Sequence, residues 1–251
     1  MTFLTPLAQI NSLQFELVIP CLNESESLPD LIHQTILAAR RFSLTPRDFQ
    51  LVIVNNGSTD SSKQVLEELK ASEEGDWFRV VSLDKNQGYG GGIYSGLKST
   101  SAKWVGFTHA DLQCNPEDAM KAFMILKEGQ KLLVKGKRKN RNWLDWITSR
   151  GYEIAVGIFW NFWSFDLNAQ PKVFDRKLTE RLEPHPTGIT FDAFVLKKAK
   201  EAGLSLRSIS VQLEKRRFGE SSWANGFKKR ALTYLKVLKE LRLQRLKFRN
   251  N

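Results

Sequence analysis

Four short apolar segments, separated by helical patterns, constrain the fold of this chain more than any other feature. They read FELVIP (15–20), QLVIVN (50–55), FRVVSL (78–83) and WVGFT (104–108). Between them, residues 27–42 repeat apolar side chains near a 3.6-residue period, and residues 58–72 open on polar capping residues before a second apolar face. This alternation predicts an α/β fold with a mostly parallel sheet flanked by helices. Ligands of such sheets bind at the carboxyl ends of the strands, so the loops there form the candidate site.

The charge balance indicates an anionic partner. The chain has 251 residues, of which 41% are hydrophobic, and a net charge of +11, with a pI near 9.7. Its size permits one large core. The positive charge favours a nucleic acid, a membrane surface or a phosphorylated substrate as partner. Of these, nucleic acid is not expected, because the sequence contains no recognised DNA-reading helix or zinc module.

Cysteine usage and hydropathy predict the compartment. Only Cys21 and Cys114 occur, so no disulfide framework is expected. Residues 1–12 lack the basic and apolar regions of a signal peptide. No segment reaches the roughly 18 apolar residues that a membrane-spanning helix needs. We therefore expect a cytoplasmic protein.

The loops after the first two strands offer polar groups to a nucleoside. In the first loop, Asn23 and Glu24 follow the proline that ends the strand. They could bind a ribose or base, or they could form a capping turn. In the second loop, Asn55 and Asn56 precede Gly57, and an amide there could pair with a nucleobase or form an Asx turn. The residues alone leave these alternatives open.

The loops after the third and fourth strands carry glycines and potential metal ligands. The third contains five glycines, which permit either close backbone packing or the binding of a phosphate at the start of a helix: Gly88, Gly90, Gly91, Gly92 and Gly96. The fourth, FTHADLQCNP, places His109, Asp111 and Gln113 at alternate positions. These three side chains suit Mn²⁺ or Mg²⁺, and a polar turn is the alternative.

The order of the motifs is more specific than any one of them. ELVIPCLNESESL, VNNGSTD, NQGYGGGIYSGL and THADLQCNPED are followed by GKRKNR, DLNAQPKVF and RRFGESSW. Over residues 14–222 the chain resembles the family-2 glycosyltransferases of the GT-A fold, and most closely the branch of dolichyl- and polyprenyl-phosphate sugar synthases. The resemblance implies a GT-A (Rossmann-like) sheet and transfer of a sugar, with inversion, from a nucleotide-diphosphate sugar.

The resemblance also implies the residues of the donor site. The nucleotide sugar would contact residues of all four loops, namely Pro20, Leu22, Asn23, Glu24, Asn56, Gly88, His109, Ala110, Asp111 and Gln113. Asp111, His109 and Gln113 would hold Mg²⁺ or Mn²⁺, which stabilises the leaving diphosphate. Asn56 and His109 stand where the family usually has aspartate. The first change weakens a hydrogen bond to the base, and the second lowers the negative charge available to a cation.

A lipid-phosphate acceptor is implied by the same branch. Such an acceptor is already an anion and needs no general base, but it needs cations to bind it, and arginine suits phosphate. The residues expected there are Arg138, Arg141, Arg217 and Ser221, and the expected catalytic set is Asp111, Arg138, Arg141 and Asp192. Asp192 would act as the base if the acceptor were a hydroxyl, or it would cap a helix.

The end of the chain is predicted to be a basic helical tail. We expect one domain over residues 1–225, with a nucleotide-sugar half at about 14–130 and an acceptor half at about 131–225. Residues 226–251 contain nine Lys or Arg and one Glu. Helical spacing places six side chains on one apolar stripe: Phe227, Ala231, Tyr234, Leu235, Leu238 and Leu241. Such a helix would lie on an anionic membrane surface or pack on the domain.

An aromatic segment at 154–165 is expected to be buried in the core, with a membrane-facing position as the alternative. Together these features favour an inverting glycosyltransferase of cell-envelope glycan biosynthesis that acts on a polyprenyl phosphate at the cytoplasmic membrane face. One alternative is transfer to a polysaccharide or glycolipid hydroxyl. The other is a non-catalytic subunit that keeps the fold with a degraded metal site. The sequence makes no prediction of oligomeric state.

Overall fold

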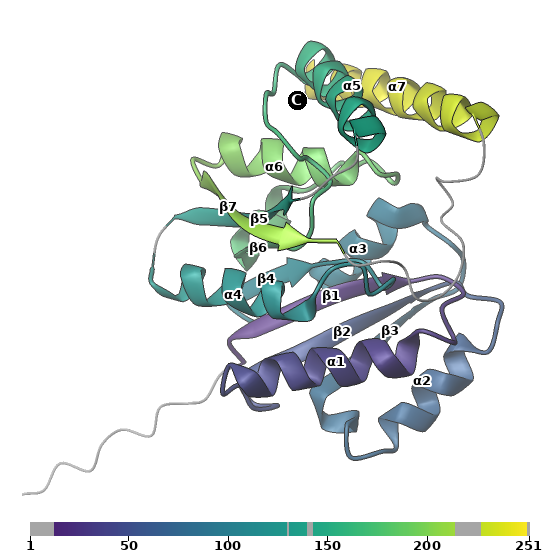
Figure 1. Ribbon diagram of the computed structural model, residues 1–251, viewed down its shortest axis with the longest axis vertical. Helices are drawn as coiled ribbons and strands as arrows, with labels where there is room; N and C mark the ends of the chain where they lie inside the picture. Colours follow the sequence, from purple (N-terminus) through teal and green to yellow (C-terminus); the bar gives the residue numbers. More distant parts are fainter. Residues whose placement is uncertain (1–12, 130, 140–142, 214–226, 250–251) are drawn as a thin grey trace, which may run out of the picture.

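The computed structural model describes residues 13–129, 131–139, 143–213 and 227–249 (Figure 1). Seven strands form one sheet in the order β3-β2-β1-β4-β6-β5-β7. They are β1 (Phe15–Cys21), β2 (Phe49–Asn56), β3 (Phe78–Leu83), β4 (Trp104–Phe107), β5 (Leu132–Lys139), β6 (Lys172–Asp175) and β7 (Ser205–Gln212). The four strands predicted from the first half of the chain are confirmed.

Most of the sheet is parallel, as expected. β1 pairs in parallel with β2 and with β4, and β2 does so with β3. β6 runs antiparallel to β4 and β5, whereas β5 and β7 are parallel. The basic residues 135–139 therefore lie in a strand, where Lys135 is buried and Lys137 is exposed. The carboxyl ends of β1, β2, β3 and β4 meet at one edge of the sheet.

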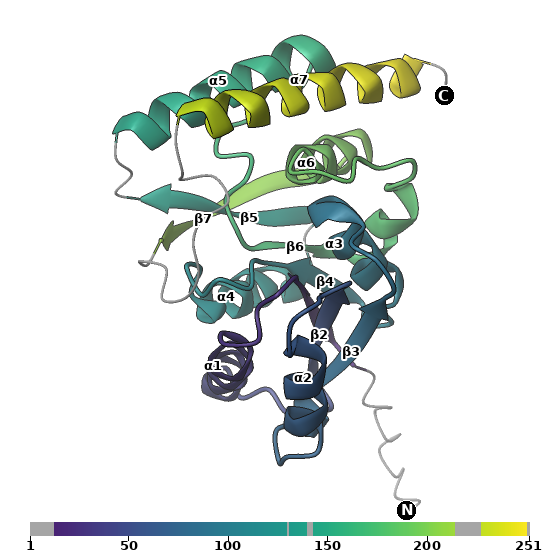
Figure 2. The same ribbon diagram turned by 90° about the vertical axis from the view of Figure 1, so that its right-hand side faces the viewer.

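Helices cover both faces of the sheet (Figure 2). One face packs against α1 (Leu28–Arg41), α2 (Ser62–Lys70) and α4 (Pro116–Lys127), and the other against α3 (Gly88–Lys98) and α6 (Phe191–Glu201). Two short 3₁₀ helices, Gly75–Trp77 and Arg176–Arg181, precede β3 and follow β6. Leu17 and Ile19 of β1 enter the first core and Val18 enters the second. This alternation is typical of a strand buried on both sides.

Two further helices lie side by side outside α6, namely α5 (Trp143–Trp160) and α7 (Phe227–Arg249) (Figures 1 and 2). The indole Nε1 of Trp160 donates a hydrogen bond to the backbone oxygen of Leu241 at 3.0 Å. The hydroxyl of Tyr234 donates to the backbone oxygen of Thr148 at 2.7 Å. These bonds fasten α7 to α5, and Leu241 joins the core on the α3 and α6 side.

The tail forms a helix, but its predicted apolar stripe is wrong. Leu241 is buried, whereas Leu235 is 63% exposed and Leu238 is 37% exposed. Val237 and Gln244 occupy the buried side instead. The side chains of two other stripe residues lie outside the described residues: Phe227 and Ala231. Because α7 packs along a narrower line than the pattern suggests, leucines share its outer surface with lysines and arginines.

The aromatic segment 154–165 divides between core and surface. Trp160 and Phe162 are buried, as expected, whereas Ile158 and Trp163 are 63% and 66% exposed. Among the helices of the described residues, none combines the length and apolar character needed to cross a bilayer. The division of the chain into two functional halves and a tail stays a prediction.

Candidate active site

Hydrogen bonds join the first and second loops at the carboxyl edge of the sheet. Asn23 has a φ of 56°, in the left-handed region that asparagine tolerates. Its side-chain oxygen accepts from Thr59 N at 2.8 Å, and its own N–H donates to the Ser58 hydroxyl at 3.1 Å. Glu24 N donates to the Ser62 hydroxyl at 3.1 Å. These bonds hold the two loops together as one unit. Contact of Asn23 and Glu24 with a nucleoside stays a prediction.

Asn56 connects the second loop to the third. Its side-chain oxygen accepts from Gln87 N at 3.0 Å, and its amide nitrogen donates to Gly88 O at 3.0 Å. Both ends of this buried amide are therefore engaged, and an aspartate could not donate the second bond. The neighbouring Asn55 accepts from Ser58 N, three positions later, at 3.0 Å, so its side chain stabilises the turn after β2. Pairing of Asn56 with a nucleobase stays a prediction.

The five glycines predicted to lie in the third loop lie instead in α3 (Gly88–Lys98), and close backbone packing explains two of them. Gly88 has a φ of 78°, and a side chain there would lie 2.5 Å from Thr187 O. A side chain at Gly90 would lie 2.5 Å from Pro186 O. The amide of Gly90 donates to Thr187 O at 2.8 Å. The first turn of α3 is thus fitted tightly against residues 186–187, which precede α6.

The fourth loop contains the predicted metal ligands. Asp111 Oδ1 accepts from Gln113 N at 3.1 Å, and Leu112 between them has a φ of 55°, so the backbone forms a polar turn. His109 is partly buried, and its ring centre lies 5.5 Å from that of Tyr89. Burial lowers the pKa of His109, although Asp111 and Asp192 act in the opposite direction. The imidazole is therefore neutral at pH 7, the form that binds a metal.

This donor set fits a divalent cation that is shared with a phosphate ligand. Within the described part of the chain, no group of three or more His, Cys, Asp and Glu is placed to hold a metal ion. Asp111, His109 and Gln113 offer one carboxylate, one neutral imidazole and one amide. Mg²⁺ sites with so few protein ligands are commonly completed by water and by substrate phosphates.

A buried polar network surrounds Asp192. The ammonium of Lys172 pairs with Asp192 Oδ1, and the two side chains are 0% and 1% exposed. Gln170 Nε2 donates to the same oxygen at 2.8 Å and to the Tyr89 hydroxyl at 3.0 Å. Burial lowers the pKa of Lys172, and Asp192 opposes that shift. The carboxylate predicted to act as a base thus serves as the counter-ion of a buried lysine.

Asp166 holds Arg138 beside this network. The backbone N–H and Nε of Arg138 donate to the Asp166 carboxylate at 2.7 and 2.9 Å. The amide of Asp166 donates to Glu153 of α5 at 2.6 Å, and Arg150 donates to the second oxygen of Glu153 at 2.6 Å. The charge of Arg138 adds to the larger effect of burial in lowering the pKa of His109. A chain of charged residues joined by hydrogen bonds therefore runs from α5 to the candidate site.

The structure brings part of the predicted set together. His109 interacts electrostatically with Asp111 of its own loop, with Arg138 of β5 and with Asp192 of α6, so three segments of the chain meet here. Around them, Pro20 and Gly88 are partly buried, Ala110 is buried and Leu22 is 39% exposed. The predicted acceptor residues Arg141, Arg217 and Ser221 lie outside the described residues.

Three residues of the candidate site and its buried network have no distinctive signal in the sequence. Lys172 lies in the short run QPKVF, which indicates a buried charge only after β6 is known to be a central strand. Glu153 lies in an aromatic helix, and its partner Asp166 follows 13 positions later. Tyr89 follows a glycine turn. Each of these side chains acquires its role from a partner that is distant in the sequence.

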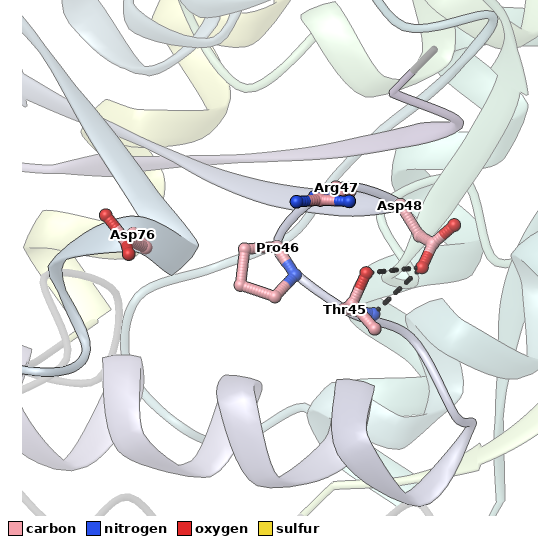
Figure 3. Close-up of a pocket in the computed structure, with 5 residues that line it drawn as sticks. All are labelled: Thr45, Pro46, Arg47, Asp48 and Asp76. Carbon is pink, nitrogen blue, oxygen red and sulfur yellow. Dashed lines mark hydrogen bonds between the residues drawn. The ribbon is translucent and has the colours of Figure 1, made fainter. Parts of the chain in front are cut away.

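Two cavities lie away from His109 and Asp111. One, of about 670 Å³, is lined by Thr45, Pro46, Arg47, Asp48 and Asp76, near the amino end of β2 (Figure 3). The Thr45 hydroxyl and amide donate to Asp48, and these bonds lower the pKa of that carboxyl. The other, of about 450 Å³, lies between α2 and β3 and includes Asn55. The candidate site is therefore identified by chemistry and position in the sheet rather than by either cavity.

Known proteins resemble this chain in sequence. The family model described as Glycosyl transferase family 2 matches residues 16–201. Undecaprenyl-phosphate 4-deoxy-4-formamido-L-arabinose transferase from Proteus mirabilis is 32% identical over 124 residues, which are 49% of this chain and 36% of that protein. The protein of the same name from Pseudomonas paraeruginosa is 29% identical over 169 residues, 66% of this chain and 48% of that protein. The chain thus spans less than half the length of these curated relatives.

Solved structures share the fold. Glucosyl-3-phosphoglycerate synthase from Mycobacterium tuberculosis, in complex with Mn²⁺, UDP-glucose and phosphoglyceric acid, gives a TM-score of 0.66 at 16% identity, covering 92% of this chain and 79% of that chain. Mannosyltransferase PcManGT from Pyrobaculum calidifontis, in complex with GDP-Man and Mn²⁺, gives 0.63 at 17% identity, covering 90% and 63%. The predicted fold class is confirmed.

Proposed function

The chain belongs to glycosyl transferase family 2, and on that premise we propose that it transfers a sugar from a nucleotide-diphosphate sugar to a polyprenyl phosphate, with inversion, at the inner face of the cytoplasmic membrane. The observation that carries the proposal is the cluster of Asp111, Arg138 and the buried Asp192 around His109. The curated relatives, which are named for undecaprenyl phosphate, support the choice of acceptor.

At the donor end, the fourth loop would hold the diphosphate. Asp111, His109 and Gln113 would bind Mg²⁺ or Mn²⁺, whose charge stabilises a leaving diphosphate. The neutral imidazole of His109 can occupy a ligand position, or donate from its N–H to a phosphate oxygen. Mn²⁺ in the solved structures of two fold neighbours supports a divalent metal here.

At the acceptor end, the state of Asp192 favours a phosphate over a hydroxyl. A hydroxyl acceptor needs a base that can take its proton, but Asp192 is buried against Lys172 and Gln170. A phosphate oxygen is already anionic and requires only positive partners. Arg138 is oriented by Asp166. Because a guanidinium has five N–H donors, Arg138 can bind the Asp166 carboxylate and an acceptor phosphate at the same time. Arg141, Arg217 and Ser221 remain predicted partners of the same phosphate.

The outer surface of α5 and α7 supports docking to an anionic membrane. α7 exposes both cations and leucines there, among them Lys236, Lys239, Arg242, Arg245, Lys247, Leu235 and Leu246. Beside it, Ile154 and Ile158 of α5 are 51% and 63% exposed. Each cation near an anionic membrane contributes about 1 kcal/mol, and exposed apolar side chains gathered on adjacent helices can insert between headgroups.

A donor panel assayed with and without Mn²⁺, against polyprenyl phosphate and a glycolipid hydroxyl, tests the activity. Asp111→Ala should abolish transfer with little change in thermal stability, whereas Asp30→Ala, which removes an exposed carboxylate from α1, should keep the native rate. Transfer by Asp111→Ala at the native rate would show that the site is misplaced. Transfer to the hydroxyl alone would favour that alternative. Absence of metal-stimulated donor cleavage would favour a non-catalytic subunit.

Flotation with vesicles that contain anionic lipid tests the docking surface. The pair Ile158→Ser and Leu246→Ser should weaken vesicle binding, because both side chains are more than half exposed on the outer surface. Leu37→Ser, on α1, removes a leucine of 37% exposure and should leave binding unchanged. Removal of residues 227–251 should also weaken binding. Equal binding by all these variants would contradict the docking proposal.

A further inference from the structure

The single acidic residue of the tail points toward the domain and not toward solvent. Glu240 Oε1 accepts from the backbone N–H of Gly188 at 2.8 Å, and Glu240 Oε2 accepts from the Thr190 hydroxyl at 2.6 Å. The fit leaves no room at Gly188, where a side chain would lie 2.6 Å from the same carboxylate. A residue on the basic helix α7 therefore makes a specific, two-point contact with a loop.

That loop, residues 183–190, leads into α6. Thr190 is the capping residue of α6, and its own side chain makes no capping bond to the helix. Glu240 adds a carboxylate near this end of α6, where Asp192 already lies in the first turn and where the peptide dipoles favour an anion. The second residue of α6 is Asp192, which pairs with Lys172 in the candidate site. The contact made by Glu240 is therefore two positions away from the buried network.

The other side of the same loop supports the start of α3, which is part of the predicted donor site. Thr187 O accepts from Gly90 N at 2.8 Å, and the backbones meet so closely that neither Gly88 nor Gly90 could carry a side chain without displacing a carbonyl of residues 186–187. A shift of the 183–190 loop would therefore move the first turn of α3, which Asn56 also holds. Glu240, the 183–190 loop and the first turn of α3 form one continuous set of contacts.

We propose that Glu240 is a positioning residue of the donor site. By fixing the 183–190 loop, Glu240 fixes the first turn of α3, residues 88–90, and the start of α6, so α7 completes the site in addition to presenting a surface to the membrane. This inference rests on the proposed function for the identity of the ligand. It assigns to the tail a role in binding the nucleotide sugar.

Attachment of α7 does not depend on Glu240 alone. Trp160 donates to Leu241 O, and Tyr234 donates to Thr148 O, and both bonds join α7 to α5. Glu240→Ala therefore removes the link to the 183–190 loop while these bonds remain. Tyr234→Phe is the matched control, because it removes one attachment of α7 without touching that loop. Glu240→Gln keeps one acceptor oxygen and should be intermediate.

Hydrogen exchange and nucleotide binding together test the proposal in the full chain. Glu240→Ala should speed exchange at the amides of Gly90 and Gly188, which local opening governs, whereas Tyr234→Phe should not. With Mn²⁺ present, Glu240→Ala should also weaken the binding of UDP or GDP roughly tenfold, which is within the usual range of coupling between sites.

Unchanged exchange in Glu240→Ala, or faster exchange with unchanged nucleotide affinity, would overturn the positioning role. An equal loss of affinity in Tyr234→Phe would do the same, because it would trace the effect to general loosening of α7. If the wild-type chain binds the nucleotide but transfers no sugar, the proposed function fails while the positioning role stands. If the wild-type chain binds neither nucleotide, both fail.

Discussion

The buried pair of Lys172 and Asp192 makes a quantitative prediction. Both side chains are almost fully removed from solvent, at 0% and 1% exposure. Asp192→Asn would leave the ammonium of Lys172 without its counter-ion, although Lys172 would keep a hydrogen bond to Ala169 O at 3.2 Å. Loss of one partner from a buried pair costs about 3–5 kcal/mol. For a domain of this size, such a loss corresponds to a fall in Tm of roughly 10 °C.

Urea unfolding followed by circular dichroism measures this loss. The double variant Asp192→Leu with Lys172→Met removes both charges, and its free energy of unfolding should recover most of the loss, because apolar residues of similar volume can replace a buried pair at little cost. A loss below about 1 kcal/mol in Asp192→Asn, far under the range for buried pairs, would refute the counter-ion assignment. The assignment would also be refuted if the double variant lost as much free energy of unfolding as Asp192→Leu and Lys172→Met lose together when measured singly.

Three further predictions concern single positions. Asn56→Asp should lower the free energy of unfolding by about 1–3 kcal/mol, because a carboxylate would face Gly88 O, which now accepts from the amide; equal urea midpoints for variant and wild type would contradict this. Gly90→Ala should cost about 1–3 kcal/mol by overpacking against the 183–190 loop, whereas Gly151→Ala, with open space around it, should cost nothing. Burial lowers the pKa of Lys135 to about 8, so between pH 8 and the usual lysine pKa of about 10.4 the unfolded chain binds more protons than the native one. Wild-type stability relative to Lys135→Met should therefore rise across that interval, and a constant difference would show that Lys135 titrates normally.

Much of the donor edge could be predicted from local sequence. Each of the first four strands ends where its apolar run ends, and Asn23, Asn56, Gly88 and Asp111 lie at or just beyond those ends. Parallel strands bring their carboxyl ends to one edge, so alternation of strands and helices was sufficient to gather these loops. The state of each side chain could not be predicted in the same way. Asn56 is an example, since its amide is engaged by the third loop.

The tail illustrates the limit of periodicity. Its spacing predicts a helix, and a helix is present, but the stripe through Leu235 and Leu238 faces outward. Helical period fixes which side chains share a face, whereas the packing partner decides which face is covered. Here α5 and the 183–190 loop select Val237, Glu240 and Leu241 as the inner side.

The sequence by itself determined the α/β class, the order of the loops and the chemical types gathered at the edge of the sheet, because these follow from short-range patterns and from the geometry of parallel strands. Tertiary structure decided the ionic partners and the burial of each group, since these depend on contacts between distant segments. Lys172 meets Asp192 across 20 positions, and Gly188 meets Glu240 across 52. Burial of a charge becomes tolerable only when such a partner is supplied, and that partner is defined by the folded chain.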